Sequence, residues 1–214
     1  MRYFENKNGA PILEAMVLSI QTHKDYLSEL DGQIGDGDHG ANMNKGFSMF
    51  KERFLTGDDI DFSDGLDELG TVLLQEIGGS MGPIYGTIFM DMADACDGAS
   101  EIDLPVFARM MAAGLEGLQD IVEAKVGDKT LIDTLVPAVD AIVAANEAGK
   151  PFTEALNDSM AAAKDGHEST KDLVAKVGRS SRLGERTKGF LDPGATSCYL
   201  LLESMMSQIL KQLK

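Results

Sequence analysis

The sequence predicts an all-α protein, with about eight helices in a single domain that spans residues 1–214. Apolar residues recur at intervals of three and four positions almost throughout the chain. No stretch alternates apolar and polar residues between turn residues, so strands are not expected. The chain has 214 residues, of which 43% are hydrophobic and 25% charged, so it has the composition of a globular protein and the length for one full core.

Apolar stripes mark the expected helices. In chain order they cover residues 12–30, 43–54, 66–77, 84–92, 107–121, 131–142 and 202–213. Pro11 suits the first turn of the first helix, and Gly78 with Gly79 suits the end of the third. Residues 152–177 predict a further, weaker and alanine-rich helix.

Three loops of unusual composition separate these helices, at residues 31–42, 78–83 and 178–194. Helices supply a scaffold and loops commonly carry the ligand contacts. The chemistry of the protein is therefore expected in these three segments.

The charge balance excludes two classes of partner. The chain carries 35 acidic and 19 basic side chains, which gives a formal net charge of −16. Nucleic acids and anionic membranes both need a basic surface, so neither is expected to bind. A phosphorylated ligand would need cations or a local basic cluster to offset the acidic field.

Cysteine usage and the N-terminus indicate a cytoplasmic protein. Cys96 and Cys198 lie far apart in apolar surroundings, which favours two buried thiols in a reducing compartment over a disulfide framework. Residues 1–8 are charged and lack the apolar core of a signal peptide. No apolar run approaches the roughly 20 residues that span a bilayer.

The first loop holds three aspartates, Asp31, Asp36 and Asp38. Asp36 and Asp38 alternate with glycines, so the backbone can turn both carboxylates toward one point. Carboxylates that close repel one another, and a divalent cation removes the repulsion. Oxygen ligands with room for water and phosphate favour Mg²⁺, so the loop predicts a magnesium site.

Other motifs fit this loop less well. Residues 35–40 match the dinucleotide pattern G-x-G-x-x-G, but an amphipathic helix precedes them instead of a buried strand. An EF-hand that starts at Asp36 would need its glutamate where Phe47 stands, and a Walker phosphate loop occurs nowhere in the sequence. A solvated acidic turn that caps the next helix is the remaining alternative.

Phosphate-binding features accompany the carboxylates. The helix that begins near His39 offers unpaired N–H groups and a positive dipole end, and His39 itself suits either a phosphate contact or a helix cap. The glycine-rich turn at residues 78–83 allows close approach to a nucleotide, or it simply joins two helices. Residues 171–190 are mainly basic, with Arg179 among them, and form either a phosphate grip or a solvated loop.

Six strings, in order over nearly the whole chain, resemble the DhaL family, the nucleotide-binding L subunits of dihydroxyacetone kinase. The longest is Gly35-Asp-Gly-Asp-His-Gly-Ala-Asn-Met43, and the others occupy residues 78–86, 127–130, 178–179, 183–186 and 192–195. The resemblance implies a closed helical barrel of eight antiparallel helices with the nucleotide at one rim. It also implies a kinase for dihydroxyacetone or a related small ketose that is active only with partner subunits.

The resemblance assigns residues to the ligand site. Asp31, Asp36 and Asp38 match the aspartates that hold two Mg²⁺ ions. The positions that match contacts to ADP or ATP are His39, Gly40, Ala41, Asn42, Ser80, Met81, Thr130, Leu131, Arg179, Asp192, Pro193 and Gly194. Relatives often carry serine where Met81 stands, so a phosphate contact there would use the backbone. Phosphoryl transfer depends on positioning and charge neutralisation, so no nucleophile or general base is assigned.

The resemblance also implies partners. In the family a separate domain binds the ketose covalently through a histidine, so a substrate-binding kinase subunit is expected. A phosphohistidine-carrying subunit of the sugar phosphotransferase system would recharge the bound ADP. A transcriptional regulator and a homodimer are left open as further partners. An ATP-exchanging kinase module for another substrate such as a lipid, a nucleotide-sensing regulatory subunit and a plain structural bundle are the alternative functions.

Overall fold

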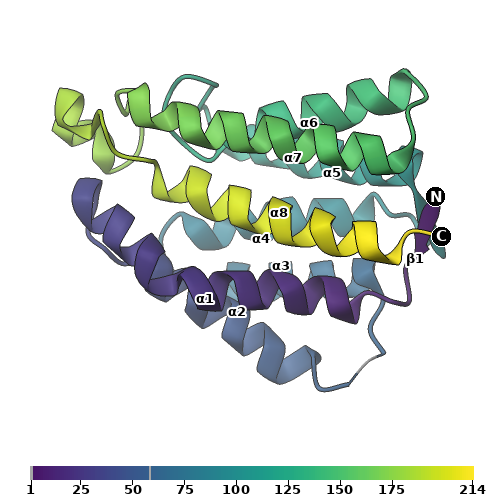
Figure 1. The fold of residues 1–214 in the computed structure, drawn as a ribbon. Coiled ribbons are helices and arrows are strands. Elements are labelled where there is room, and N and C mark those ends of the chain that lie inside the picture. Colours follow the sequence, from purple (N-terminus) through teal and green to yellow (C-terminus); the bar gives the residue numbers. More distant parts are fainter. Residues whose placement is uncertain (1, 58) are drawn as a thin grey trace.

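Helices form most of the regular structure in the computed structural model, which describes residues 2–57 and 59–214 (Figure 1). In these ranges eight α-helices follow one another: α1 (Ala10–Ile34), α2 (His39–Phe54), α3 (Phe62–Glu76), α4 (Met81–Asp94), α5 (Leu104–Ile121), α6 (Ile132–Glu147), α7 (Phe152–Ser169) and α8 (Pro193–Gln212). Two 3₁₀ segments, η1 (Thr170–Asp172) and η2 (Ser180–Thr187), lie before α8. The predicted all-α class is confirmed.

Successive helices run in opposite directions and pack side by side (Figure 1). Each helix contacts the next one along the chain, and α8 packs against α1. This order brings the last helix back to the first. The closed barrel itself stays a prediction.

The core is built from the predicted stripes. Ile12, Met16 and Ile20 of α1 are almost completely buried, as are Phe47 and Phe50 of α2. Phe47 of α2 meets Phe89 of α4 edge to face, with 6.4 Å between ring centroids. Each fully buried side chain of this size contributes roughly 1.5–3 kcal/mol of transfer free energy. Cys96 and Cys198 are buried free thiols, as predicted.

A small sheet corrects the prediction that strands are absent. Strand β1 (Tyr3–Glu5) pairs antiparallel with β2 (Glu101–Asp103). Strands of three residues are too short to show alternation in a sequence, because the period needs several residues to be recognised. The chain ends meet beside this sheet: the amide of Arg2 donates to the Lys214 carbonyl at 2.6 Å, and the amide of Lys214 donates to the Tyr3 carbonyl at 2.9 Å.

Two helix boundaries also differ from the prediction. Helix α1 continues through Asp31 to the buried Ile34, so Asp31 lies on a helix and not in a loop. Helix α7 ends at Ser169 and not near residue 177, because the chain turns there into η1. Among the helices of the described residues, none has the length and apolar character that crossing a membrane requires.

Candidate functional site

A cavity of about 410 Å³ opens where the even-numbered helices begin. His39 of α2, Met81 of α4, Ile132 of α6 and Pro193 of α8 all line it. Because neighbouring helices alternate in direction, these four N-termini meet at one end of the molecule. Unpaired N–H groups and the positive dipole ends of helices favour an anion at such a place.

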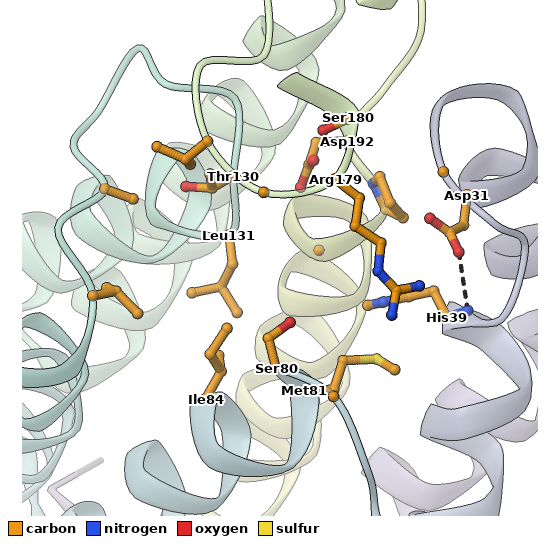
Figure 2. Close-up of a pocket in the computed structure, with 18 of the residues that line it drawn as sticks. Asp31, His39, Ser80, Met81, Ile84, Thr130, Leu131, Arg179, Ser180 and Asp192 are labelled. Carbon is orange, nitrogen blue, oxygen red and sulfur yellow. Dashed lines mark hydrogen bonds between the residues drawn. The ribbon is translucent and has the colours of Figure 1, made fainter. Parts of the chain in front are cut away.

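The three aspartates of the sequence prediction gather at one side of this cavity. One carboxylate oxygen from each of Asp31, Asp36 and Asp38 can be chosen so that all three lie within 4.8 Å of one another. Asp31 is oriented by the start of α2, since the His39 amide donates to its Oδ2 at 3.2 Å (Figure 2). Gly37 makes the turn between the other two, with a φ of 79° that favours glycine.

Arg179 reaches across the opening toward this cluster (Figure 2). Its Nη1 forms an ion pair with Asp36 Oδ2 and lies 3.9 Å from Asp38 Oδ2. One guanidinium offsets one of three carboxylate charges, so a net negative charge of two is left in the cluster. A site made of carboxylate oxygens alone fits a hard divalent cation such as Mg²⁺.

The other wall of the cavity is apolar (Figure 2). Ile84, Leu118 and Leu131 line it. The buried carboxylate of Asp133 accepts hydrogen bonds from the amides of Gly127 at 2.6 Å and Thr130 at 2.7 Å. These bonds fix the loop between α5 and α6, which places Thr130 and Leu131 at the wall.

Asp192 caps the helix at the back of the cavity. Its Oδ2 accepts a hydrogen bond from the Ala195 amide at 2.7 Å, and the residue is buried. Burial raises the pKa of Asp192 to about 7, while the Ala195 amide and the Lys129 ammonium act in the opposite direction. This cap begins α8 at Pro193.

His39 takes part in an internal polar network. Its ring Nε2 lies 2.8 Å from Ser197 Oγ, which is 2.6 Å from the Tyr85 hydroxyl. Burial lowers the pKa of His39 to about 4, despite the nearby Asp31 carboxylate, so the ring is neutral at pH 7. The ring therefore links α2 to Ser197 of α8, and its contacts do not support the alternative of a helix cap.

The structure brings most of the predicted site residues together. The cavity is lined by Asp31, Asp36, Asp38, His39, Asn42, Ser80, Met81, Thr130, Leu131, Arg179, Asp192, Pro193 and Gly194. Gly40 and Ala41 are not among its lining residues. Gly40 is buried against α1, where a Cβ atom would stand 2.0 Å from the Lys24 carbonyl oxygen.

Several lining residues were missed by the sequence analysis. Leu118, Val122 and Val177 line the cavity but read in the sequence as ordinary apolar positions, so no local signal separates them from the core. Lys129 is different, because it stands inside the string at residues 127–130 that carried part of the family resemblance. A lysine in that string was a signal that could have been used.

Comparison with known proteins gives the same assignment. The DAK2 domain family matches residues 33–207. The ADP-binding subunit DhaL of a PEP-dependent dihydroxyacetone kinase from Listeria innocua is 40% identical over 187 residues, which cover 87% of this chain and 88% of that subunit. The corresponding DhaL subunit of Escherichia coli is 36% identical over 186 residues, covering 87% and 89%.

A solved structure supports the fold. The dihydroxyacetone kinase from C. freundii, in complex with AMP-PNP and Mg²⁺, superimposes with a TM-score of 0.68 at 21% identity. The match covers 93% of this chain and 33% of that longer kinase. With the family match over most of its length and two DhaL subunits at these identities, the chain belongs to the DAK2-domain family, as a DhaL-type member.

Proposed function

We propose that this chain is the nucleotide- and magnesium-binding subunit of a kinase for dihydroxyacetone or a related small ketose. The observation that carries the proposal is the position of the carboxylate cluster, which lies at the start of α2 and shares one cavity with the starts of α4, α6 and α8. The volume of this cavity, about 410 Å³, falls within the range of roughly 300–1,000 Å³ that is typical of small-molecule sites. The DhaL relatives are named ADP-binding subunits.

Each part of the cavity has a role in this proposal. Asp31, Asp36 and Asp38 would hold two Mg²⁺ ions, which supply positive charge to the phosphate oxygens. The start of α4, at residues 80–81, would donate backbone N–H groups to the phosphates, while the His39 amide at the start of α2 holds Asp31. The adenine ring would lie against the apolar wall around Leu131, with Thr130 and residues 192–194 beside the nucleoside.

The chain itself would position the nucleotide and neutralise its charge. His39 is neutral and already bonded to Ser197, so it is poorly placed to act as a base. The three carboxylates are committed to cations. This division of labour fits phosphoryl transfer, in which positioning and electrostatic stabilisation dominate.

Partner subunits complete the proposed enzyme. The relatives from L. innocua and E. coli are named subunits of PEP-dependent dihydroxyacetone kinases, which supports the presence of partner subunits. One partner would hold the ketose, and another would deliver the phosphoryl group from a phosphohistidine. The buried free thiols of Cys96 and Cys198 suit the reducing cytoplasm. A homodimer and a transcriptional regulator as partner stay predictions.

ADP is expected to raise the melting temperature of the protein only when Mg²⁺ is present. Without the cation, the carboxylate cluster would repel the diphosphate, so there is little binding free energy to add to stability. Thermal denaturation with ADP, in Mg²⁺ and separately in a chelator, checks this. Equal stabilisation in both conditions would indicate a pocket that binds nucleotide without metal.

The purified chain alone is expected not to phosphorylate dihydroxyacetone from ATP. The proposal assigns the ketose site to a partner, so the nucleotide would have no acceptor held in reach. A coupled assay with and without the substrate-binding subunit measures the difference. Turnover by the isolated chain would overturn the division into subunits, and turnover with free ATP and the substrate-binding subunit alone would favour an ATP-exchanging kinase.

A further inference from the structure

The segment that carries Arg179 is closed at its base. We call residues 171–189 the arginine loop. Its ends lie together, because the Gly189 amide donates to the Lys171 carbonyl at 2.7 Å. Just outside it, the Asp192 amide donates to Thr170 Oγ1 at 3.1 Å. A loop whose ends are joined in this way depends on the contacts at its base for its direction.

One buried lysine contacts both ends of this loop. The Lys129 residue is 1% exposed, and its Nζ donates to the carbonyls of Thr170 and Phe190, each at 2.5 Å. These two residues directly precede and follow the arginine loop. The same ammonium therefore joins the loop's two ends to each other and to the segment before α6.

Lys129 is itself held in place. The amides of Gly127 and Thr130, on both sides of it, donate to the Asp133 carboxylate at the start of α6. Its backbone has a φ of 63°, a left-handed conformation that is unusual for a residue other than glycine and persists when the surroundings enforce it. The lysine thus connects the arginine loop to a rigid helix start.

A buried ammonium needs compensation, and the structure supplies it. Asp192, Asp133 and Asp172 lie near enough to favour the charged form, although burial lowers the pKa of Lys129 overall. Loss of the ammonium would leave the Phe190 carbonyl without this donor, while the Thr170 carbonyl would keep the Leu173 amide at 3.2 Å. The two ends of the arginine loop would then lose the ammonium that joins them.

We propose that Lys129 is a positioning residue, which holds the base of the arginine loop so that Arg179 lies over the carboxylate cluster. The proposal rests on the function proposed above, because it gives Arg179 its place at that site. Lys129 acts through Arg179, since its own ammonium is already engaged by the Thr170 and Phe190 carbonyls.

We call the contacts of the Lys129 ammonium with the Thr170 and Phe190 carbonyls the clamp. It is tested first by hydrogen exchange in protein without nucleotide. Lys129→Met keeps an unbranched side chain but removes the donors, and the amides of residues 171–189 are expected to exchange at least about tenfold faster. Lys129→Arg should restore part of the protection. The matched control is Lys176→Met, which breaks the exposed Lys176–Asp128 ion pair of 3.0 Å between the same two segments. Exposed pairs contribute little, so the control should exchange like wild type.

A second variant covers a failure of Lys129→Met to fold. Lys129→Gln keeps an N–H donor without the charge. Its loop amides should exchange faster than those of wild type and more slowly than those of Lys129→Met. If Lys129→Met does not fold, the comparison of Lys129→Gln with wild type is enough. Protection of the α1 and α2 amides should not change. Loop exchange in folded Lys129→Met or Lys129→Gln equal to that of wild type would refute the clamp.

A double-mutant cycle separates positioning from general stability. With partner subunits present, Lys129→Met should lower kcat/KM by about tenfold, and adding it to Arg179→Met should cause little further loss, because both changes remove the same arginine from the site. Losses that multiply in the double variant would overturn the link to Arg179. If wild-type protein fails to bind ADP, the proposed function falls while the exchange result on the clamp still stands.

Discussion

Asp36→Asn is expected to weaken binding of Mg-ADP by at least about 100-fold, because it removes a charged ligand from the proposed metal site. The amide that replaces the carboxylate is a weaker ligand, and the cluster loses one negative charge. Asp36 has a side chain that is 50% exposed, and its ion-pair partner Arg179 is also exposed. The fold is therefore expected to be unaffected by the substitution.

Isothermal titration with ADP and Mg²⁺ measures this effect, and far-ultraviolet circular dichroism checks that helicity is unchanged. Asp67→Asn provides the matched control, since it makes the same chemical change at an exposed position of α3 away from the cavity. Wild-type affinity in Asp36→Asn would remove the carboxylate cluster from the proposal. A similar loss in both variants would point to net charge instead of a specific ligand.

Gly40→Ala is expected to destabilise the protein by about 3 kcal/mol, for a reason unrelated to ligand binding. The added Cβ would lie 2.0 Å from the Lys24 carbonyl oxygen and 2.8 Å from the Ser28 amide nitrogen, both backbone atoms of α1. These atoms cannot move aside without separating α1 from α2. Alanine would favour the helix by up to about 1 kcal/mol, so the clash decides the sign.

Thermal denaturation should show a melting temperature lower by roughly 6–12 °C for Gly40→Ala, at about 2–4 °C per kcal/mol for a chain of this size. Gly57→Ala is the control, because among the described residues, apart from its chain neighbours, no atom lies within 4 Å of the added Cβ. An unchanged melting temperature in Gly40→Ala would show that the α1–α2 contact adapts. The last glycine of the string at residues 35–40 would then need a role at the ligand.

The helices were predictable because burial repeats along each of them. The stripes at residues 12–30 and 107–121 fall within α1 and α5. Boundaries were less predictable, because they depend on tertiary contacts. Helix α1 continues past Asp31 because Ile34 is still buried in the core, and no residue near this position in the sequence indicates the longer helix.

The site was predictable where charge and glycine make a segment unusual. Asp36 and Asp38 stand out in the sequence, and the structure brings them to Asp31. The apolar wall was not predictable, because Leu118 facing a cavity looks the same as a core leucine. The contact of Lys129 with the ends of the arginine loop was also not predictable, since its partners lie 41 and 61 positions further along the chain.

The meeting of the chain ends has a practical consequence. Arg2 and Lys214 are joined by a backbone hydrogen bond beside the small sheet, at the end of the helices away from the arginine loop (Figure 1). A dye or an immobilising tag fused at either end would therefore extend away from the cavity mouth. Protein captured on a sensor surface by such a tag would present that mouth to solution, which suits direct measurement of partner docking.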